Sequence, residues 1–340
     1  MSSTTITRSI GNANFPGIGI GLMSLSGMYT SSGTPADEER LAFLDAAVER
    51  GCTFFDSADA YGDSEDLLGR WFKHSGKRDS IFLATKFGFT SDPNRFINGD
   101  PAYVKEAVEK SLKRLGVDAI DLYYLHRADS TVPIELTVGA MAELVKEGKV
   151  KHIGLSEISS ATLRRAHAVH PIAAVQVEYS PFTLDIEDEK VGLLKTCREL
   201  GVKVVAYAPL GRGLLTGQVR SPDDMDAKDW RRQIPRYSKE NFPNIMKITD
   251  GLQAIADRHN ATSSQVAIAW VLAQGDDIIT IPGTNKIKYL DENMKAASIK
   301  LSAEELAEVR KIAETADASA AGDRYPPGLS QTLFADTPAL

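Results

Sequence analysis

The sequence is poor in the residues that cross-linked, metal-bound or membrane-spanning proteins need. Its 340 residues include two cysteines, Cys52 and Cys197, which lack the spacing of a metal-ligand pair. Two cysteines cannot form a disulfide framework, so we expect a reduced cytoplasmic protein without a metal site. No apolar run approaches the roughly 18 residues of a membrane helix. The first residues contain no apolar stretch of signal-peptide length, so we expect no membrane association.

Positive charge is also in short supply. Lys and Arg total 39 against 46 Asp and Glu, which gives a formal net charge of -7. A nucleic-acid-binding protein usually has a basic excess or a dense basic stripe, and this sequence has neither. We therefore expect no nucleic-acid partner and assign the acidic surplus to solubility. The sequence leaves the oligomeric state open.

What the sequence has is a regular alternation of two patterns. Short apolar runs of the kind found in buried strands recur along the chain: GIGIGL from Gly17, CTFF from Cys52, IFLAT from Ile81, AIDLYYL from Ala119, HIGLS from His152, AAVQV from Ala173, VKVVAY from Val202 and DIITIP from Asp277. Between them lie amphipathic segments that predict helices, at residues 37–51, 103–116, 135–149, 160–170 and 189–201.

Eight such runs in one chain predict a (β/α)₈ TIM barrel with long loops at its C-terminal face. An open, doubly wound sheet is the alternative, because strand order cannot be read from the sequence. No Pro/Ser-rich linker divides the chain, so we predict a single domain over residues 1–340, with the barrel at about 15–316 and a C-terminal tail at about 317–340. Residues 211–244 interrupt the rhythm after the seventh run, and a loop of this length is usually functional or disordered.

Ionisable side chains follow three of the predicted strands. Asp56 and Tyr61 come after CTFF, Lys86 after IFLAT and His126 after AIDLYYL. Residues just beyond the C-terminal ends of barrel strands converge on one pocket. Each residue alone has a structural interpretation: a helix cap, a rim aromatic, a solvated strand end and a hydrogen-bonded histidine. Their occurrence together favours a catalytic site.

The side-chain chemistry of these four residues suggests how they could act together. A phenol is a poor acid at neutral pH unless its anion is stabilised. A nearby ammonium stabilises it by opposite charge, an imidazole can donate a hydrogen bond, and a carboxylate keeps the amine protonated. Such a set would let Tyr61 protonate a developing oxyanion while a hydride arrives at carbon.

The segments FFDSADAYG, LATKFG, IDLYYLH, HIGLSE, YAPLGRGLLTG and IPGTNKIKYLDEN resemble the aldo-keto reductase superfamily. The resemblance is to its microbial and fungal branches, which are also similar to pyridoxal reductases and potassium-channel β-subunits, and it extends from Gly17 to about Asp317. It implies the barrel fold, NADPH as cofactor, and a catalytic tetrad of Asp56, Tyr61, Lys86 and His126.

The GIGIG run lacks the spacing of a dinucleotide fingerprint, so we interpret it as the first barrel strand and expect NADPH in the barrel mouth. Ser156 and Gln176, near strand ends, are candidates for the nicotinamide amide, and Tyr207 resembles the family's ring-stacking aromatic. Family members often have Ser-Asn where this chain has Ser156-Glu157, which puts an amide-binding role for Glu157 in doubt.

Two further segments are candidates for the cofactor's phosphates. The loop from Pro209 offers backbone amides of small residues, and the resemblance carries over Leu210, Gly211 and Gly213, with charge added by Arg212. A helix start after the eighth run favours phosphate, and there Lys286 resembles the residue that meets the 2′-phosphate. Many relatives have two basic residues where this chain has Asn285-Lys286, so the strictness for NADPH over NADH stays open. The remaining candidates at this end are Thr284, Glu292 and Asn293.

Substrate contacts are predicted from nearness to the tetrad alone. The candidates are Met28, Tyr29, Phe87, Arg324 and Tyr325, and the insertion with Trp230, Arg231, Arg232 and Arg236 is a candidate cover. Together these features predict reduction of small aldehydes, or ketones, with Tyr61 as general acid. Two alternatives stay open: a redox-sensing, cofactor-binding subunit of the channel type, and a Schiff-base aldolase that uses Lys86 as nucleophile.

Overall fold

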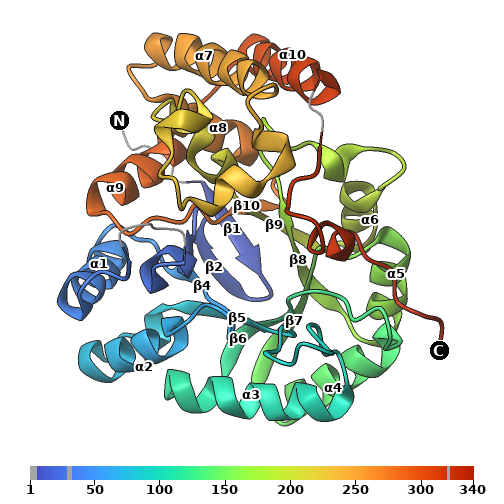
Figure 1. Ribbon diagram of the computed structural model, residues 1–340. Coiled ribbons are helices and arrows are strands. Elements are labelled where there is room, and N and C mark those ends of the chain that lie inside the picture. Colours follow the sequence, from blue (N-terminus) through green and yellow to red (C-terminus); the bar gives the residue numbers. More distant parts are fainter. Residues whose placement is uncertain (1–5, 29–32, 320–321) are drawn as a thin grey trace.

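A computed structural model describes residues 6–28, 33–319 and 322–340 of the chain. Parallel strands form an eight-stranded sheet in sequential order, ringed by helices (Figure 1). The strands are β3 (Ile20–Gly21), β4 (Phe54–Asp56), β5 (Phe82–Phe87), β6 (Ile120–Leu125), β7 (Val150–Ser156), β8 (Ile172–Glu178), β9 (Lys203–Tyr207) and β10 (Ile278–Thr280). All eight lie within or next to the apolar runs of the sequence.

The first and last strands come together, which closes the sheet. Parallel bridges join Ile18 to Thr280 and Gly21 to Gly283. The amide of Gly19 donates to the carbonyl of Thr280 at 2.8 Å. The (β/α)₈ prediction is therefore confirmed, and the open sheet is excluded because an open sheet leaves its two edges apart.

Helices cover the outer face of the barrel. They are α1 (Asp37–Glu49), α2 (Ser64–Ser75), α3 (Pro101–Leu115), α4 (Ile134–Lys146), α5 (Ser160–Val169), α6 (Leu193–Leu200), α7 (Phe242–Arg258), α8 (Ser263–Leu272), α9 (Ile287–Lys295) and α10 (Ala303–Ser319). The five predicted helical segments match α1, α3, α4, α5 and α6. Residues 211–237 contain short 3₁₀ segments, and two helices, α7 and α8, stand between β9 and β10.

Local sequence explains several helix boundaries. The Asp100 side chain accepts a hydrogen bond from the amide of Ala102, Pro101 occupies the first turn, and Gly116 ends α3 in the left-handed conformation. Thr262 and Gln265 form a reciprocal capping box at the start of α8. These end signals fix where each helix leaves and rejoins the barrel.

An N-terminal hairpin, which the sequence analysis did not predict, covers one end of the barrel (Figure 1). Its strands β1 (Thr7–Ile10) and β2 (Ala13–Pro16) are antiparallel. The Phe15 ring packs 5.0 Å from Phe54 and 5.1 Å from Phe82, at the starts of β4 and β5. The hairpin therefore seals the N-terminal face and leaves the opposite face for the site.

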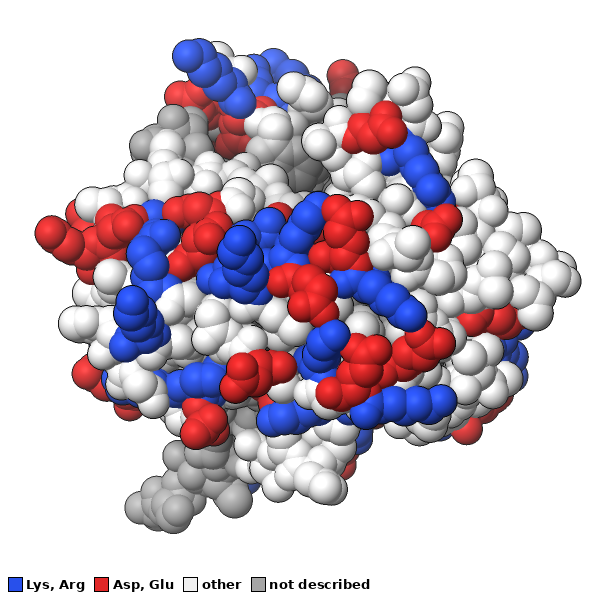
Figure 2. Space-filling view, turned by 90° about the horizontal axis from the view of Figure 1, so that it is seen from below, with Lys and Arg blue, Asp and Glu red and all other residues white. Residues whose placement is uncertain are grey.

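Charge on the outer helices is mixed in sign. Lys105 of α3 pairs with Glu143 of α4 at 2.6 Å, and Lys149 pairs with Glu109 at 2.7 Å. The side of the molecule on which α3 lies shows acidic and basic side chains intermingled (Figure 2). No described helix combines the length and the apolarity needed to cross a bilayer. The described residues also contain no group of three His, Cys, Asp or Glu side chains placed to share a metal ion.

Candidate active site

The barrel brings the four predicted catalytic residues together at its C-terminal face. Asp56 is the last residue of β4, Lys86 lies in β5, His126 follows β6, and Tyr61 stands between β4 and α2. Asp56, Tyr61 and His126 line one cavity of about 1270 Å³, and Lys86 lies directly behind Tyr61. The convergence follows from the parallel strands, whose C-terminal ends all meet at this face.

The Lys86 ammonium joins the other groups. Its Nζ donates to Asp56 Oδ1 and to the carbonyl oxygen of Ser57 at 2.6 Å, and it lies 3.4 Å from the Tyr61 hydroxyl. The second carboxylate oxygen of Asp56 accepts from Gln176 Nε2 at 2.7 Å. Lys86 and Asp56 are fully buried, so this hydrogen-bonded pair fixes a charge beside the phenol in a site of low dielectric.

Burial governs the ionisation of these groups. Burial lowers the pKa of Lys86, and the Asp56 carboxylate opposes that shift, so the ammonium form depends on Asp56. Burial and the Asp56 charge raise the pKa of Tyr61, and the charge of Arg127 opposes them. The phenol therefore keeps its proton across the neutral range, which is the form that a general acid needs.

His126 completes the group as a neutral imidazole. Burial and the charges of Lys86 and Arg127 hold its pKa well below the usual value. The ring lies edge-on to Tyr61, with centroids 5.7 Å apart, and Nδ1 is buried without a hydrogen-bond partner. A neutral imidazole can donate a hydrogen bond to a substrate oxygen without carrying charge into the site.

The cavity extends away from the tetrad along the predicted cofactor residues. Its lining contains the nicotinamide candidates and most of the phosphate and adenine candidates: Ser156, Gln176, Tyr207, Leu210, Gly213, Thr284, Glu292 and Asn293. Gly213 has a φ of 92°, in the left-handed region that favours glycine. A cavity of this size exceeds the usual volume of a drug-sized pocket, so it has room for a dinucleotide and a small substrate together. The residues present therefore fit NADPH.

Two of the predicted cofactor residues lie outside this lining. Gly211 is buried beside Phe182 and Leu215. Lys286 is exposed at the start of α9, where its amide donates to the Thr284 hydroxyl at 3.1 Å. The position of Lys286 at a helix N-terminus agrees with the phosphate prediction, while its side chain is placed at the rim and not in the cavity wall.

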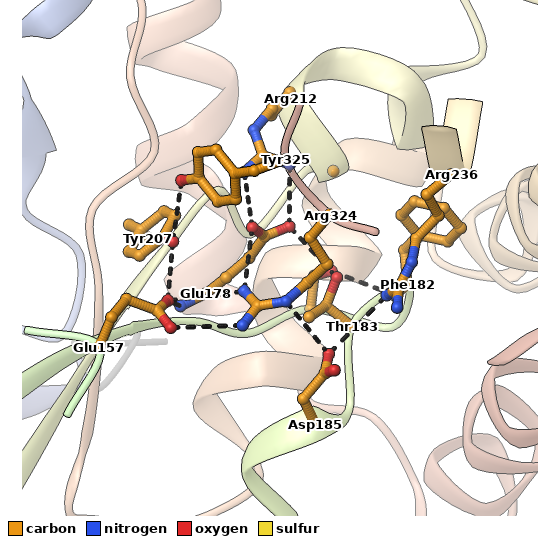
Figure 3. Close-up of polar contacts among 12 residues, drawn as sticks. Glu157, Glu178, Phe182, Thr183, Asp185, Tyr207, Arg212, Arg236, Arg324 and Tyr325 are labelled. Carbon is orange, nitrogen blue, oxygen red and sulfur yellow. Dashed lines mark hydrogen bonds and ion pairs between the residues drawn. The ribbon is translucent and has the colours of Figure 1, made fainter. Parts of the chain in front are cut away.

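Glu157 is engaged with the C-terminal tail instead of facing the cavity. Its fully buried carboxylate accepts from the Tyr207 hydroxyl at 2.7 Å and pairs with Arg324 at 3.3 Å (Figure 3). The residue has a φ of 49°, which is strained for a non-glycine residue. Arg324 lowers the pKa of Glu157 against the effect of burial, so the carboxylate is ionised. Because its side chain is paired with Arg324 and does not line the cavity, Glu157 is not placed to bind the nicotinamide amide.

A second buried glutamate extends this arrangement, which we call the tail latch: Glu157, Glu178, Arg212 and Arg324. Glu178 at the end of β8 accepts from Arg212 at 2.6 Å and from Arg324 at 3.2 Å (Figure 3). Tyr325 follows, with its hydroxyl 3.0 Å from that of Tyr207. The latch thus fixes the tail beside the predicted nicotinamide-stacking ring, and it neutralises the charge that Arg212 was expected to offer to a phosphate.

The predicted substrate residues are placed unevenly. Met28 and Tyr325 line the cavity, whereas Tyr29 lies outside the described residues. Phe87 is a correction: it is fully buried and stacks on Tyr123 between the barrel and the helices. Because strand side chains alternate, Lys86 points inward and its neighbour must point outward. Arg324 is a second correction, since it belongs to the latch and not to the cavity lining.

Part of the insertion that was predicted to cover the site lies in the cavity wall. Trp230 and Arg231 line the cavity, while Arg232 and Arg236 do not. Arg231 donates to the carbonyl oxygen of Arg212 at 2.7 Å, which joins the middle of the insertion to its first residues after β9. Both cysteines are free and buried.

Sequence reasoning missed many residues of the cavity wall, three of which lie close to the tetrad in sequence. Arg127 directly follows His126, Phe89 is three residues beyond Lys86, and Asp59 lies between Asp56 and Tyr61. Nearness to the tetrad was the available signal for all three. Arg127 is the residue that could most easily have been predicted, because a basic side chain directly follows the predicted catalytic residue His126 in the sequence.

Comparison with known proteins shows which sequences and structures this chain resembles. The sequence matches the Aldo/keto reductase family over residues 17–314. It is 59% identical to "Aldo-keto reductase str7" of Strobilurus tenacellus over 323 residues, which cover 94% of each chain. It is 49% identical to "Aldo-keto reductase yakc [NADP(+)]" of Schizosaccharomyces pombe over 98% of each chain. The glycerol dehydrogenase AKR11B4 of Gluconobacter oxydans has a similar structure, with a TM-score of 0.80 and 27% identity over 92% of this chain and 95% of that one.

The barrel fold and these relatives identify an oxidoreductase of the type that uses NADP(H). The protein belongs to the aldo-keto reductase family.

Proposed function

We propose that the protein reduces aldehydes to alcohols with NADPH, with ketones as a second carbonyl class, and that Tyr61 donates the proton. The observation that carries the proposal is the Lys86 ammonium, held between Asp56 and the Tyr61 hydroxyl at the base of the cavity. Bound NADPH supplies the hydride. The protein's own residues hold and deliver the proton.

Each side chain has a distinct part in this proposal. Tyr61 carries the proton to the carbonyl oxygen, and His126 donates a hydrogen bond to the same oxygen as charge builds on it. Lys86 stabilises the phenolate that remains, and Asp56 keeps Lys86 charged and in place. Ser156 and Gln176 orient the nicotinamide amide. The Gln176 amide nitrogen is bonded to Asp56, which leaves Oε1 as its acceptor.

Tyr61→Phe tests the proposed acid. Removal of the hydroxyl should lower kcat by about 10²- to 10⁴-fold, the usual contribution of general acid catalysis, because no proton reaches the oxyanion. The NADPH dissociation constant, measured by fluorescence titration, should stay within about twofold. Tyr103→Phe is the matched control, because its hydroxyl also lines the cavity but bonds to the Phe89 carbonyl. A fully active Tyr61→Phe enzyme would show that another group is the acid.

Experiments on the wild-type protein separate the two alternatives. Tight NADPH binding without turnover on a panel of aldehydes would support a cofactor-binding subunit. Covalent trapping of a carbonyl compound on Lys86 by borohydride would support an aldolase. The bonds from Lys86 to Asp56 and to the Ser57 carbonyl argue against the aldolase, because a nucleophilic amine must be neutral and accessible.

A further inference from the structure

One basic side chain in the cavity differs from the others. The other described arginines and lysines that line the cavity have a carboxylate partner: Arg95 pairs with Asp129, Lys110 with Glu106, Arg114 with Glu65, Arg212 with Glu178 and Arg231 with Asp229. Arg127 has no ion pair within the described part of the chain. It is also the one next to the catalytic histidine in sequence.

Arg127 is held in place without being neutralised. It is 6% exposed, and its Nη1 donates to the His126 carbonyl at 2.7 Å and to Ser156 Oγ at 3.2 Å. Its guanidinium lies over the Phe89 ring at 5.9 Å, and its Nε is buried without a hydrogen-bond partner. The acceptors that it has are neutral oxygens, so the positive charge is oriented but not paired.

The carboxylates around it are committed elsewhere. Glu157 pairs with Arg324 and accepts from Tyr207, and Asp56 pairs with Lys86. A buried charge without a counter-ion is unfavourable. The planar fork of a guanidinium matches the two oxygens of a carboxylate. An anion that enters the cavity would therefore find a fixed, partly desolvated partner beside Tyr61 and His126.

We propose that Arg127 determines substrate class by binding the carboxylate of a carbonyl compound, so that the preferred substrates are oxo acids and aldehyde acids. This inference rests on the proposed reductase function. The carbonyl group faces Tyr61 and His126 while the carboxylate pairs with Arg127. Arg127 is then a specificity-determining residue, which sets the preference for acidic substrates through their binding and orientation.

The cofactor is the less suitable anion for Arg127. The side chain contacts Ser156, which we assign to the uncharged nicotinamide amide. The phosphates are assigned to the loop from Leu210 and to the start of α9, at Thr284. The cavity carboxyl nearest in sequence to Tyr61, that of Asp59, has a pKa raised to about 7 by burial and by Glu65. Its negative charge is therefore reduced at and below neutral pH, so it repels an incoming carboxylate less.

A matched substrate pair tests the proposal in the intact enzyme. 4-Carboxybenzaldehyde and methyl 4-formylbenzoate carry the same aldehyde, and only the first is an anion. The measured quantity is the ratio of kcat/KM for the acid to kcat/KM for the ester. Arg127→Gln should lower this ratio by about 10- to 100-fold, the effect of losing a charge-assisted hydrogen bond. Arg127→Lys should restore part of it, because it keeps the charge without the fork.

A second arginine of the cavity provides the control. Arg95→Gln removes a guanidinium that is already paired with Asp129, so the ratio should stay at the wild-type value. Calorimetric binding of 4-(hydroxymethyl)benzoate to the NADP⁺ complex gives a readout independent of turnover. Its affinity should fall by the same factor in Arg127→Gln and be unaffected in Arg95→Gln.

The outcomes separate the two proposals. An unchanged ratio in Arg127→Gln, or a weaker NADPH affinity with no change of ratio, would overturn the substrate inference and leave the reductase function standing. A wild-type protein that reduces neither aldehyde, nor others of a broad panel, would overturn the reductase function. The binding experiment would then still report whether Arg127 takes a carboxylate.

Discussion

Single residues in this site owe their properties to burial as much as to their neighbours. Asp59 shows this outside the tetrad, since its carboxyl lies in the cavity wall with Oδ1 buried and unpartnered. Burial and the charge of Glu65 raise its pKa to about 7. A group with a raised pKa binds its proton more tightly in the folded state than in the unfolded state.

This residue predicts a pH-dependent stability difference. As pH rises from about 4 to about 7, the unfolded state ionises Asp59 first, so the wild-type protein loses stability that Asp59→Asn keeps. The unfolding free energy of Asp59→Asn relative to wild type should therefore rise by about 2–3 kcal/mol between pH 5 and pH 8. Urea unfolding at the two pH values measures it. A difference that is constant with pH would show that the carboxyl titrates normally.

The meeting of Asp56, Tyr61, Lys86 and His126 could be predicted from the sequence because they lie at or just beyond strand ends, where the order of the chain fixes their location. Phe87 was placed wrongly because it was judged by its nearness to Lys86, although alternation along β5 turns it to the opposite face. Arg324 could not be assigned, because its partners Glu157 and Glu178 are about 150 residues away in sequence and only the folded chain shows them.

At the scale of elements, the position of the C-terminal tail depends on contacts with residues far away in the sequence. Arg324 makes the ion pairs to both glutamates of the latch. Later in the tail, Ala335 forms a bridge with Ile158, which lies between β7 and α5. Farther along, Arg165 donates to the Thr337 carbonyl at 2.9 Å. The tail is thus anchored at two separate places.

Arg324→Met should release the first anchor. It leaves Glu157 and Glu178 buried with one cationic partner fewer, which costs about 3–5 kcal/mol of stability. Hydrogen exchange should accelerate over residues 325–337. Arg165→Met is the control, with faster exchange confined to residues 337–340. Unchanged exchange in the tail of Arg324→Met would mean that the latch does not hold it.

Helix packing gives a second prediction at this scale. Gly69 in α2 lies so close to α3 that an added Cβ would meet the Arg114 carbonyl oxygen. Gly69→Ala should therefore destabilise the protein by about 1–3 kcal/mol, as overpacking does, despite the better helix propensity of Ala. Gly139→Ala in α4, where an added Cβ meets nothing within 4 Å, should stabilise it by about 0.5–1 kcal/mol. Thermal unfolding compares the two, and equal shifts would refute the packing argument.

Apolar runs predicted the barrel strands because a parallel sheet is buried on both faces. The hairpin β1–β2 escaped prediction because its strands are four residues each, with polar and apolar residues mixed. The helices after β9 were also missed, since the insertion separates them from their strand and breaks the rhythm on which the prediction depended.

At the scale of the whole molecule, the two ends of the barrel have separate tasks. The hairpin fills one end with Phe15, and the catalytic residues occupy the other. In barrels of this type, residues at the N-terminal face generally contribute to stability, and residues at the C-terminal face form the active site.

Phe15→Ala tests that separation. Loss of the ring should cost about 3–5 kcal/mol of unfolding free energy through the cavity that it leaves. Well below the melting temperature, kcat and the NADPH dissociation constant should match those of the wild type. A fall in kcat in the folded variant would show that the floor of the barrel is coupled to the site.

The tail latch also bears on how the chain is made. Arg324 leaves the ribosome well after its partners Glu157 and Glu178, which precede it by 167 and 146 residues. During synthesis Glu157 must wait, hydrated or loosely packed, because its counter-ion has not yet emerged, whereas Glu178 can already pair with Arg212. A nascent chain cut short before residue 324 would contain every proposed catalytic side chain and still lack the ion pairs from Arg324 to Glu157 and Glu178.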